Sequence, residues 1–232
     1  MIDVLVLGAG WATESHPVTD AFIEALDSAR FVPRVVPYSS LRASGREVLA
    51  QAIEQTANRV VIAGYAQGAA IAGDFAQEVG DDVWVHLEVI ACALIADPLR
   101  PSGKHIGADP GGHGIGGERR IDRLPTYWAA AQDDPITALP ADNPLRTIAN
   151  LADYLAVSSE DEINCWAQKL VDISISKLCV RSCSLEFRHK WGRALAHARA
   201  LRFDGRHSTD YARYGHAVAL AEVINRTVPG SD

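Results

Sequence analysis

The chain has 232 residues, of which 48% are hydrophobic and 22% are charged. This length suits one well-packed domain that carries an insertion, and it is short for two full domains. The formal net charge of -7 argues against nucleic acid as a partner, because proteins that bind phosphate backbones usually present a basic surface.

The amino-terminal residues predict no targeting segment. Met1 to Leu7 leads directly into a strand pattern and has neither the basic start nor the cleavable apolar stretch of a signal peptide. No run of residues reaches the roughly 18 apolar positions of a membrane-spanning helix, so we expect no membrane span.

The four cysteines, Cys92, Cys165, Cys179 and Cys183, lack the C-x-x-C spacing of a zinc site. Cys92 lies in a predicted core strand, which favours a buried free thiol. Cys179 and Cys183 either face each other across one helical turn or form a disulfide in a loop, and the sequence leaves both arrangements open. We expect neither a metal nor another cofactor.

The first strand, over residues 3–8, ends in Gly8-Ala9-Gly10. The third glycine of a dinucleotide-binding loop is absent and no helical pattern begins before about Thr19, so a Rossmann loop is disfavoured. We favour a loop whose backbone N–H groups supply half of an oxyanion hole. Next along the chain we expect a helix over 19–30 capped by Thr19 or Asp20, a strand over 32–38, and a helix from Ser39 or Ser40 to about Asn58.

The most informative stretch is residues 60–79, where a β-branched run meets the turn Gly64-Tyr65-Ala66-Gln67-Gly68 and continues as a small-residue helix. In G-x-S-x-G hydrolases this sharp turn lifts a serine out of the sheet, and its glycines leave room for the strained backbone and the close helix. Here the central residue is Ala66. The frame of a nucleophile elbow is therefore present without its nucleophile.

Two further strands are predicted, over 83–96 before Asp97-Pro98 and over 127–136, where Asp133 and Asp134 occur. Strands that alternate with helices imply a mostly parallel sheet with helices on both faces. Sites in such sheets lie at the carboxyl ends of the strands. This rule brings the first-strand loop, the elbow and both acidic turns to one edge.

Residues 101–120 form a glycine-rich loop that carries His105, Asp109 and His113. The spacing of these three residues fits no helix or strand face. We therefore favour a loop that lines a cleft over a metal site.

Residues 143–201 change character, with helical periodicity over 145–157, 160–175 and 185–201. We predict a helical insertion at 143–201 within a domain whose core comprises 1–142 and 202–232. Trp166 and Trp191 either pack between these helices or belong to a cap over an apolar substrate. A short strand at 201–203 and a last helix at 214–228 complete the expected elements.

Ala66, Asp134 and His207 follow the chain order nucleophile, acid, histidine of the α/β-hydrolases. The segments around them resemble the cutinase family. G-Y-A-Q-G stands where cutinases have G-Y-S-Q-G, Asp133-Asp134-Pro135-Ile136 is similar to their acid turn, and His207 with Tyr211 is similar to their histidine segment.

The mycobacteriophage lysin B group, cutinase-like enzymes that cleave the mycolic ester of arabinogalactan, is the more similar group. The shared features are Ala96 to Arg100, the glycine loop at 114–117 and the helical insertion. The resemblance covers nearly the whole chain, although the disulfides of cutinases have no clear counterpart. It implies an α/β-hydrolase fold, a three-layer sandwich with a central, mostly parallel sheet.

The resemblance also implies the roles of the site residues. A serine at position 66 would attack an ester carbonyl while His207 takes its proton, and Asp134, which we choose over Asp133, orients the imidazolium. The oxyanion would be held by the backbone N–H of Gln67 and by that of Trp11 or Ala12.

Tyr65, His113 and Trp166 are expected to contact the substrate, which the resemblance implies is mycolylarabinogalactan or another lipid ester. The expected route is synthesis in the host cytoplasm followed by action at the cell envelope once the membrane is breached. The oligomeric state is left open.

The alanine at position 66 has two explanations. A serine-to-alanine substitution made by engineering keeps every partner in place, whereas a natural pseudoenzyme is free to lose its acid and histidine. Because this chain retains both, we favour engineering. The rival functions are a general cutinase-like esterase and a non-catalytic protein that binds lipid or cell wall.

Overall fold

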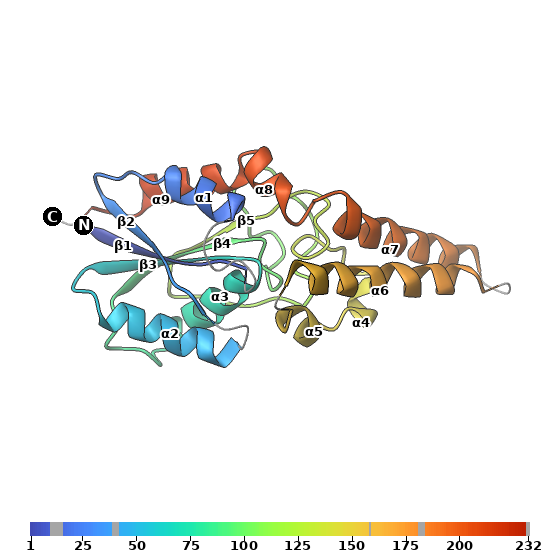
Figure 1. The fold of residues 1–232 in the computed structure, drawn as a ribbon, viewed down its shortest axis with the longest axis horizontal. Coiled ribbons are helices and arrows are strands. Elements are labelled where there is room, and N and C mark those ends of the chain that lie inside the picture. The colour runs from blue at the N-terminus through green and yellow to red at the C-terminus, as the bar shows by residue number, and fades with distance from the viewer. Residues whose placement is uncertain (10–15, 39–41, 158, 181–183, 231–232) are drawn as a thin grey trace.

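The computed structural model describes residues 1–9, 16–38, 42–157, 159–180 and 184–230 (Figure 1). In this part of the chain, five parallel strands form one sheet in the order β2-β1-β3-β4-β5. The strands are β1 (Ile2–Leu7), β2 (Phe31–Val35), β3 (Arg59–Tyr65), β4 (Val89–Ile95) and β5 (Thr126–Ala129).

The central strands β1, β3 and β4 are buried on both faces because they are almost continuously apolar, whereas most residues of edge strand β2 are exposed. Along β1, Val4 and Val6 join one hydrophobic cluster while Leu5 and Leu7 join another, as the two-residue period of a strand requires. The first cluster contains residues of α1 (Pro17–Glu24) and α9 (His216–Thr227), and the second contains residues of α2 (Arg42–Glu54) and α3 (Gln67–Gly80). These helix pairs cover opposite faces of the sheet and make a three-layer sandwich (Figure 1).

The remaining helices are α4 (Leu145–Ile148), α5 (Leu151–Leu155), α6 (Glu160–Leu178), α7 (Leu185–Phe203) and the short α8 (Thr209–Arg213). Serines cap the two long ones, since Ser159 accepts a hydrogen bond from Glu162 N and Ser184 accepts one from Phe187 N. Helices α6 and α7 lie side by side as a hairpin that projects away from the sheet (Figure 1).

A third hydrophobic cluster joins this helical region to the sandwich. It contains Tyr154, Trp166 and Trp191 from the helices together with Ala70 of α3 and Ile136 from the loop after β5. The region is thus packed onto the elbow helix. The division of the chain into a core and an insertion stays a prediction.

The predicted strand at 201–203 is wrong, because these residues form the last turn of α7. Extending an existing helix by three residues adds a hydrogen bond for each residue fixed, whereas a three-residue strand here would have no neighbour to pair with.

Strands β4 and β5 are shorter than predicted. Val83 and Val85, which suggested an early start for β4, are 58% and 78% exposed and lie outside the sheet. The chain turns away from the sheet after β5, so Asp133 and Asp134 lie in a turn.

Helix α1 begins at Pro17 and ends at Glu24, so neither Thr19 nor Asp20 is its cap. The ring of His16 accepts from Val18 N at 3.3 Å, and a proline suits the first helical position because its missing N–H would have had no helical partner. Strand β2 ends at Val35, ahead of Pro37, which has no N–H to donate. The suggested caps Ser39 and Ser40 lie outside the described residues.

Cys92 is fully buried and free, as predicted, while Cys165 and Cys179 are exposed free thiols. Cys183 lies outside the described residues. None of the helices in the described ranges has the length and apolar character needed to cross a membrane.

Candidate active site

The turn between β3 and α3 has the geometry of a nucleophile elbow. Ala66 connects them with φ 56° and ψ -114°, a conformation that L residues rarely adopt. A Cβ on Gly64 would lie 2.3 Å from Gly68 O, and one on Gly68 would lie 2.2 Å from Leu7 O. Both glycines are therefore required by close backbone crossings, which confirms the strand, elbow and helix predicted from the sequence.

Backbone strain collects at this edge of the sheet. Besides Ala66, the non-glycine residues Ala96 and Asp133 have φ values of 55° and 62°, and they follow strands β4 and β5. The other non-glycine residue with positive φ in the described ranges, Asp82, follows α3 instead. Residues held in such conformations cluster at functional sites, where the surrounding structure maintains them. The strained residues therefore indicate a functional site at the carboxyl edge of the sheet.

Asp134 and His207 meet at this edge, 73 residues apart in the chain. His207 Nδ1 lies 3.1 Å from Asp134 Oδ2, and both residues are buried. The hydroxyl of Tyr211 donates to the same oxygen at 2.6 Å, while Asp134 Oδ1 accepts from Ile136 N at 2.9 Å. Asp133 is exposed, so Asp134 is the aspartate of the pair that contacts the histidine.

The carboxylate decides the tautomer of the histidine. Because an ionised carboxylate only accepts hydrogen bonds, Nδ1 of His207 carries the proton that points to Asp134. Nε2 of the neutral ring is then an acceptor, as a histidine needs to be if it is to take a proton from a nucleophile.

The second ring nitrogen of His207 has a partner that the sequence did not predict. The hydroxyl of Tyr154, in α5, lies 2.8 Å from His207 Nε2, and the Tyr154 side chain is fully buried. Burial raises the pKa of the Tyr154 phenol well above its ordinary value, so the neutral phenol donates. No sequence signal marks Tyr154, which sits among apolar residues at ordinary helical spacing.

Gln67 links the same helix to the elbow. Its side-chain amide donates to Tyr154 O at 2.8 Å and to Val157 O at 2.9 Å. Its backbone stands at the first position of α3, where a donor to an oxyanion is expected. The other predicted donors, Trp11 and Ala12, lie outside the described residues.

The residues expected to touch substrate have different surroundings. Tyr65 is buried under His207 and donates to its backbone carbonyl at 2.9 Å. The Trp166 ring lies 5.3 Å from that of Tyr154, and both are buried. His113 exchanges backbone hydrogen bonds with Leu139, which lies five residues beyond Asp134. Substrate contact by Tyr65, His113 and Trp166 stays a prediction.

Asp97, at the end of β4, is committed to other partners. It lies 3.3 Å from Arg119 Nη2 and accepts from Trp128 Nε1 at 3.1 Å. Burial raises its pKa and the Arg119 charge opposes that rise. A Cβ on Gly73 of α3 would lie 1.3 Å from Arg119 Nη1, so the guanidinium packs directly against the backbone of this helix.

The glycine-rich loop is tied to the acid turn by Arg100, which is fully buried. Its guanidinium donates to Thr137 O at 2.8 Å and to four carbonyls of the loop, those of Pro101, Lys104, Gly111 and Gly112. His105 Nε2 lies 3.7 Å from Asp109 Oδ1, but across the described ranges no three His, Cys, Asp or Glu side chains gather as metal ligands would.

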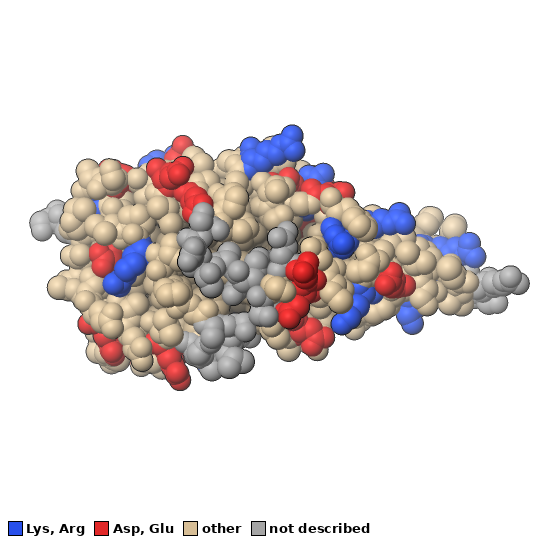
Figure 2. All heavy atoms as spheres, viewed as in Figure 1, with Lys and Arg blue, Asp and Glu red and all other residues tan. Residues whose placement is uncertain are grey.

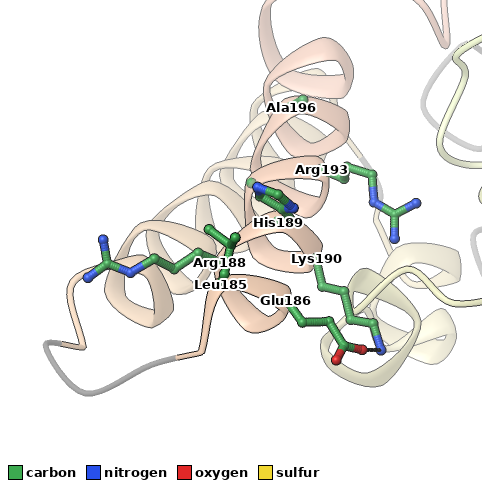
Figure 3. Close-up of a pocket in the computed structure, with 8 residues that line it drawn as sticks. Leu185, Glu186, Arg188, His189, Lys190, Arg193 and Ala196 are labelled. Carbon is green, nitrogen blue, oxygen red and sulfur yellow. Dashed lines mark ion pairs between the residues drawn. The ribbon is translucent and has the colours of Figure 1, made fainter.

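A hollow of about 820 Å³ lies on the outer face of α7 and is lined by residues 185–196 of that helix (Figure 3). It shares no residue with the acid–histidine pair. The hollow therefore does not belong to the candidate active site. On the face seen in Figure 2, Lys and Arg side chains are more frequent along the α6–α7 hairpin than over the sheet.

No protein-family model matches the sequence, and comparison with curated proteins finds no match. Among solved structures, a cutinase-like protein from Cryptococcus sp. is 16% identical, with a TM-score of 0.46 over 68% of this chain and 96% of that one. The cutinase of Trichoderma reesei, solved with a C11Y4 phosphonate inhibitor, is 18% identical, with a TM-score of 0.36 over 72% of this chain and 73% of that one.

The chain has the α/β-hydrolase fold. Its parallel sheet, the strained elbow after β3, the aspartate beyond β5 and the histidine after the helical region are the defining parts, in the defining order. The elbow residue, at position 66, is alanine. Its role as the nucleophile position stays a prediction.

Proposed function

We propose that this chain is a cutinase-like carboxylic ester hydrolase of the lysin B type in which the nucleophile is replaced by alanine. The observation that carries the proposal is the buried hydrogen bond between Asp134 and His207 at the edge of the sheet where the elbow turns. A serine hydrolase needs a histidine oriented by an aspartate in this way, whereas a purely structural role does not require the pair.

The chemistry requires a serine at position 66. Its Oγ would attack the ester carbonyl carbon while the hydroxyl proton passes to His207 Nε2, and Asp134 would stabilise the imidazolium. The alcohol would leave with that proton, giving an acyl-serine that water hydrolyses to the free acid. The backbone N–H of Gln67, with that of Trp11 or Ala12, would stabilise the oxyanion in both steps.

With Ala66 the covalent step has no nucleophile. Removing the serine of such a triad lowers turnover by about a million-fold, and the residual rate comes from binding and the oxyanion hole. We therefore expect the chain as it stands to be inactive towards esters.

The proposed substrate is a mycolic ester of arabinogalactan. Apolar residues of the helical region would form a wall for the acyl chain; they are Leu151, Leu155, Ile163, Trp166 and Leu170. Leu151 packs against Gly116, so the helices touch the glycine-rich loop that would leave room for the polysaccharide. Synthesis in the host cytoplasm and release to the envelope during lysis complete this proposal.

A second function is favoured by one observation. Ala66 is fully buried and Nε2 of His207 is already satisfied by Tyr154, as in a site that no longer performs catalysis. The second candidate is therefore a non-catalytic protein that binds lipid or cell wall on a hydrolase scaffold.

The deciding experiment restores the hydroxyl. Ala66→Ser should hydrolyse p-nitrophenyl esters of medium to long chain and should release free mycolic acids from purified mycolylarabinogalactan. Ala66→Ser with His207→Ala is the matched control and should stay at background. Hydrolysis of short soluble esters without mycolate release would support a general esterase, and no hydrolysis at all would favour the binding protein.

A further inference from the structure

Tyr154 stands where a catalytic serine hydroxyl would stand in the hydrogen-bond chain. In a serine hydrolase the acceptor nitrogen of the histidine faces the nucleophile. Here His207 Nε2 receives the Tyr154 hydroxyl at 2.8 Å, and both Tyr154 and Ala66 are fully buried. Tyr154 itself is no substitute nucleophile, because burial raises the pKa of its phenol.

The segment that carries Tyr154, residues 150–157, contacts the elbow through the side chain of Gln67. The side-chain amide of Gln67 donates to the backbone carbonyls of Tyr154 and Val157. Within the described ranges, the segment is not paired with the sheet as a strand. Within the segment Tyr154, Leu155 and Val157 are buried while Ala152, Asp153 and Ala156 are exposed. The segment is therefore buried on one side and open to solvent on the other, and short elements at the surface open more readily than the central strands of a sheet.

The surroundings of the Tyr154 ring describe what could replace it. The ring packs against Trp166 at 5.3 Å and shares a hydrophobic cluster with Leu170 and Ile136. At its tip, the hydroxyl meets Nε2 of His207. If the ring withdrew, it would leave an apolar space that ends at an acceptor nitrogen. An apolar acyl chain suits such a space, and a serine hydroxyl at position 66 would supply the donor to that nitrogen.

We propose that Tyr154 closes the site, and that the 150–157 segment must withdraw from Gln67 and His207 before an apolar acyl ester can reach position 66. This inference rests on the proposed function. Withdrawal exchanges the three hydrogen bonds described above for bonds to water and exposes the apolar side chains of Leu155 and Val157. The closed state is therefore the more populated one, and the open state is a minor state that a ligand can select.

The test measures access to position 66 with a fluorophosphonate probe, which reacts covalently with an activated serine. Two full-length variants are compared, Ala66→Ser and Ala66→Ser with Tyr154→Phe. Phenylalanine keeps the ring but leaves Nε2 without a donor in the closed state, so the closed state is weakened. We expect labelling roughly threefold to tenfold faster in the double variant, the effect of one buried hydrogen bond.

The matched control is Ala66→Ser with Tyr127→Phe, which removes a tyrosine hydroxyl from β5 outside this network and should leave the labelling rate unchanged. Hydrogen–deuterium exchange of residues 150–157 gives a second readout that needs no serine. In the Ala66 protein, Tyr154→Phe should speed exchange in this segment and not in α3.

The outcomes separate the two proposals. Equal labelling of Ala66→Ser with and without Tyr154→Phe, together with unchanged exchange, would overturn the closure and leave the hydrolase proposal standing. A third variant, Ala66→Ser with Tyr154→Gly, removes the whole Tyr154 side chain. If neither this variant nor the others were labelled, both the hydrolase proposal and the closure would be overturned. Faster labelling restricted to the Tyr154 variants supports both.

Discussion

Tyr211 and His207 share one oxygen of Asp134. The tyrosine hydroxyl lies 2.6 Å from Oδ2 and the histidine Nδ1 lies 3.1 Å from the same atom. The hydroxyl of Tyr211 also accepts from Ala131 N at 3.1 Å, so one side chain joins the end of β5 to the acid. Tyr211 is therefore a positioning residue for the carboxylate that orients the histidine.

Tyr211→Phe should weaken both stability and the restored activity. The change leaves Ala131 N without its partner in a buried place, which costs about 1 to 3 kcal/mol of unfolding free energy. In the Ala66→Ser background we expect a severalfold lower kcat and an altered pH profile of kcat, because Asp134 loses a hydrogen bond to its ionised form. A lower melting temperature with an unchanged pH profile would reduce Tyr211 to a structural role.

The two neighbouring aspartates should differ sharply in the Ala66→Ser background. Asp134→Asn removes the acceptor that sets the tautomer of His207 and should lower kcat about ten-thousandfold. Asp133→Asn should change it by no more than about twofold, since the side chain is exposed and asparagine tolerates the positive φ at this position. Steady-state kinetics with one ester ranks the two, and the reverse ranking would move the role to Asp133.

Gly68→Ala should disrupt the elbow. Its added methyl group would lie 2.2 Å from Leu7 O, and backbone atoms on both sides cannot yield, so we expect a loss of about 2 kcal/mol or more. The matched control is Gly192→Ala, in the interior of α7, where the new Cβ meets nothing within 4 Å. There alanine should stabilise by about 0.5 to 1 kcal/mol, and chemical denaturation of both variants gives the comparison.

His216 should make stability fall in mild acid. Burial lowers the pKa of its ring below the ordinary value of 6.5, and the charge of Asp210 opposes this shift. His216 is also the first residue of α9, and the helix dipole disfavours a positive charge at that end. The unfolded chain therefore binds the proton more tightly than the folded one, so stability decreases as the pH falls through about 6.5.

His216→Gln should flatten the slope of unfolding free energy against pH between about pH 7 and pH 5. His189→Gln, on the exposed face of α7, is the control and should leave the slope unchanged. An identical slope in the unsubstituted protein and in His216→Gln would show that other groups govern the acid sensitivity.

The sequence by itself determined the features that depend on neighbours in the chain. The glycines at 64 and 68 enclose position 66, and their spacing predicts the elbow because the turn and the close crossing are local. The apolar strand patterns predicted a parallel sheet, and the rule that sites lie at the carboxyl ends of such strands predicted that the elbow and the Asp134 turn share one edge. The chain order of Ala66, Asp134 and His207 indicated an α/β-hydrolase. Local patterns failed where a strand signal had no partner, as at 201–203.

Only the tertiary structure decided which groups meet. Asp133 and Asp134 are neighbours that only a family resemblance distinguished in the sequence. In the structure, the turn beyond β5 exposes Asp133 to solvent and brings Asp134 to a histidine 73 residues away. Tyr154 is 53 residues from His207 and 87 from Gln67, and nothing in its local pattern distinguishes it from an ordinary core residue. Hydrogen bonds between distant segments depend on how helices pack on the sheet, and that packing is a property of the whole chain rather than of any window within it.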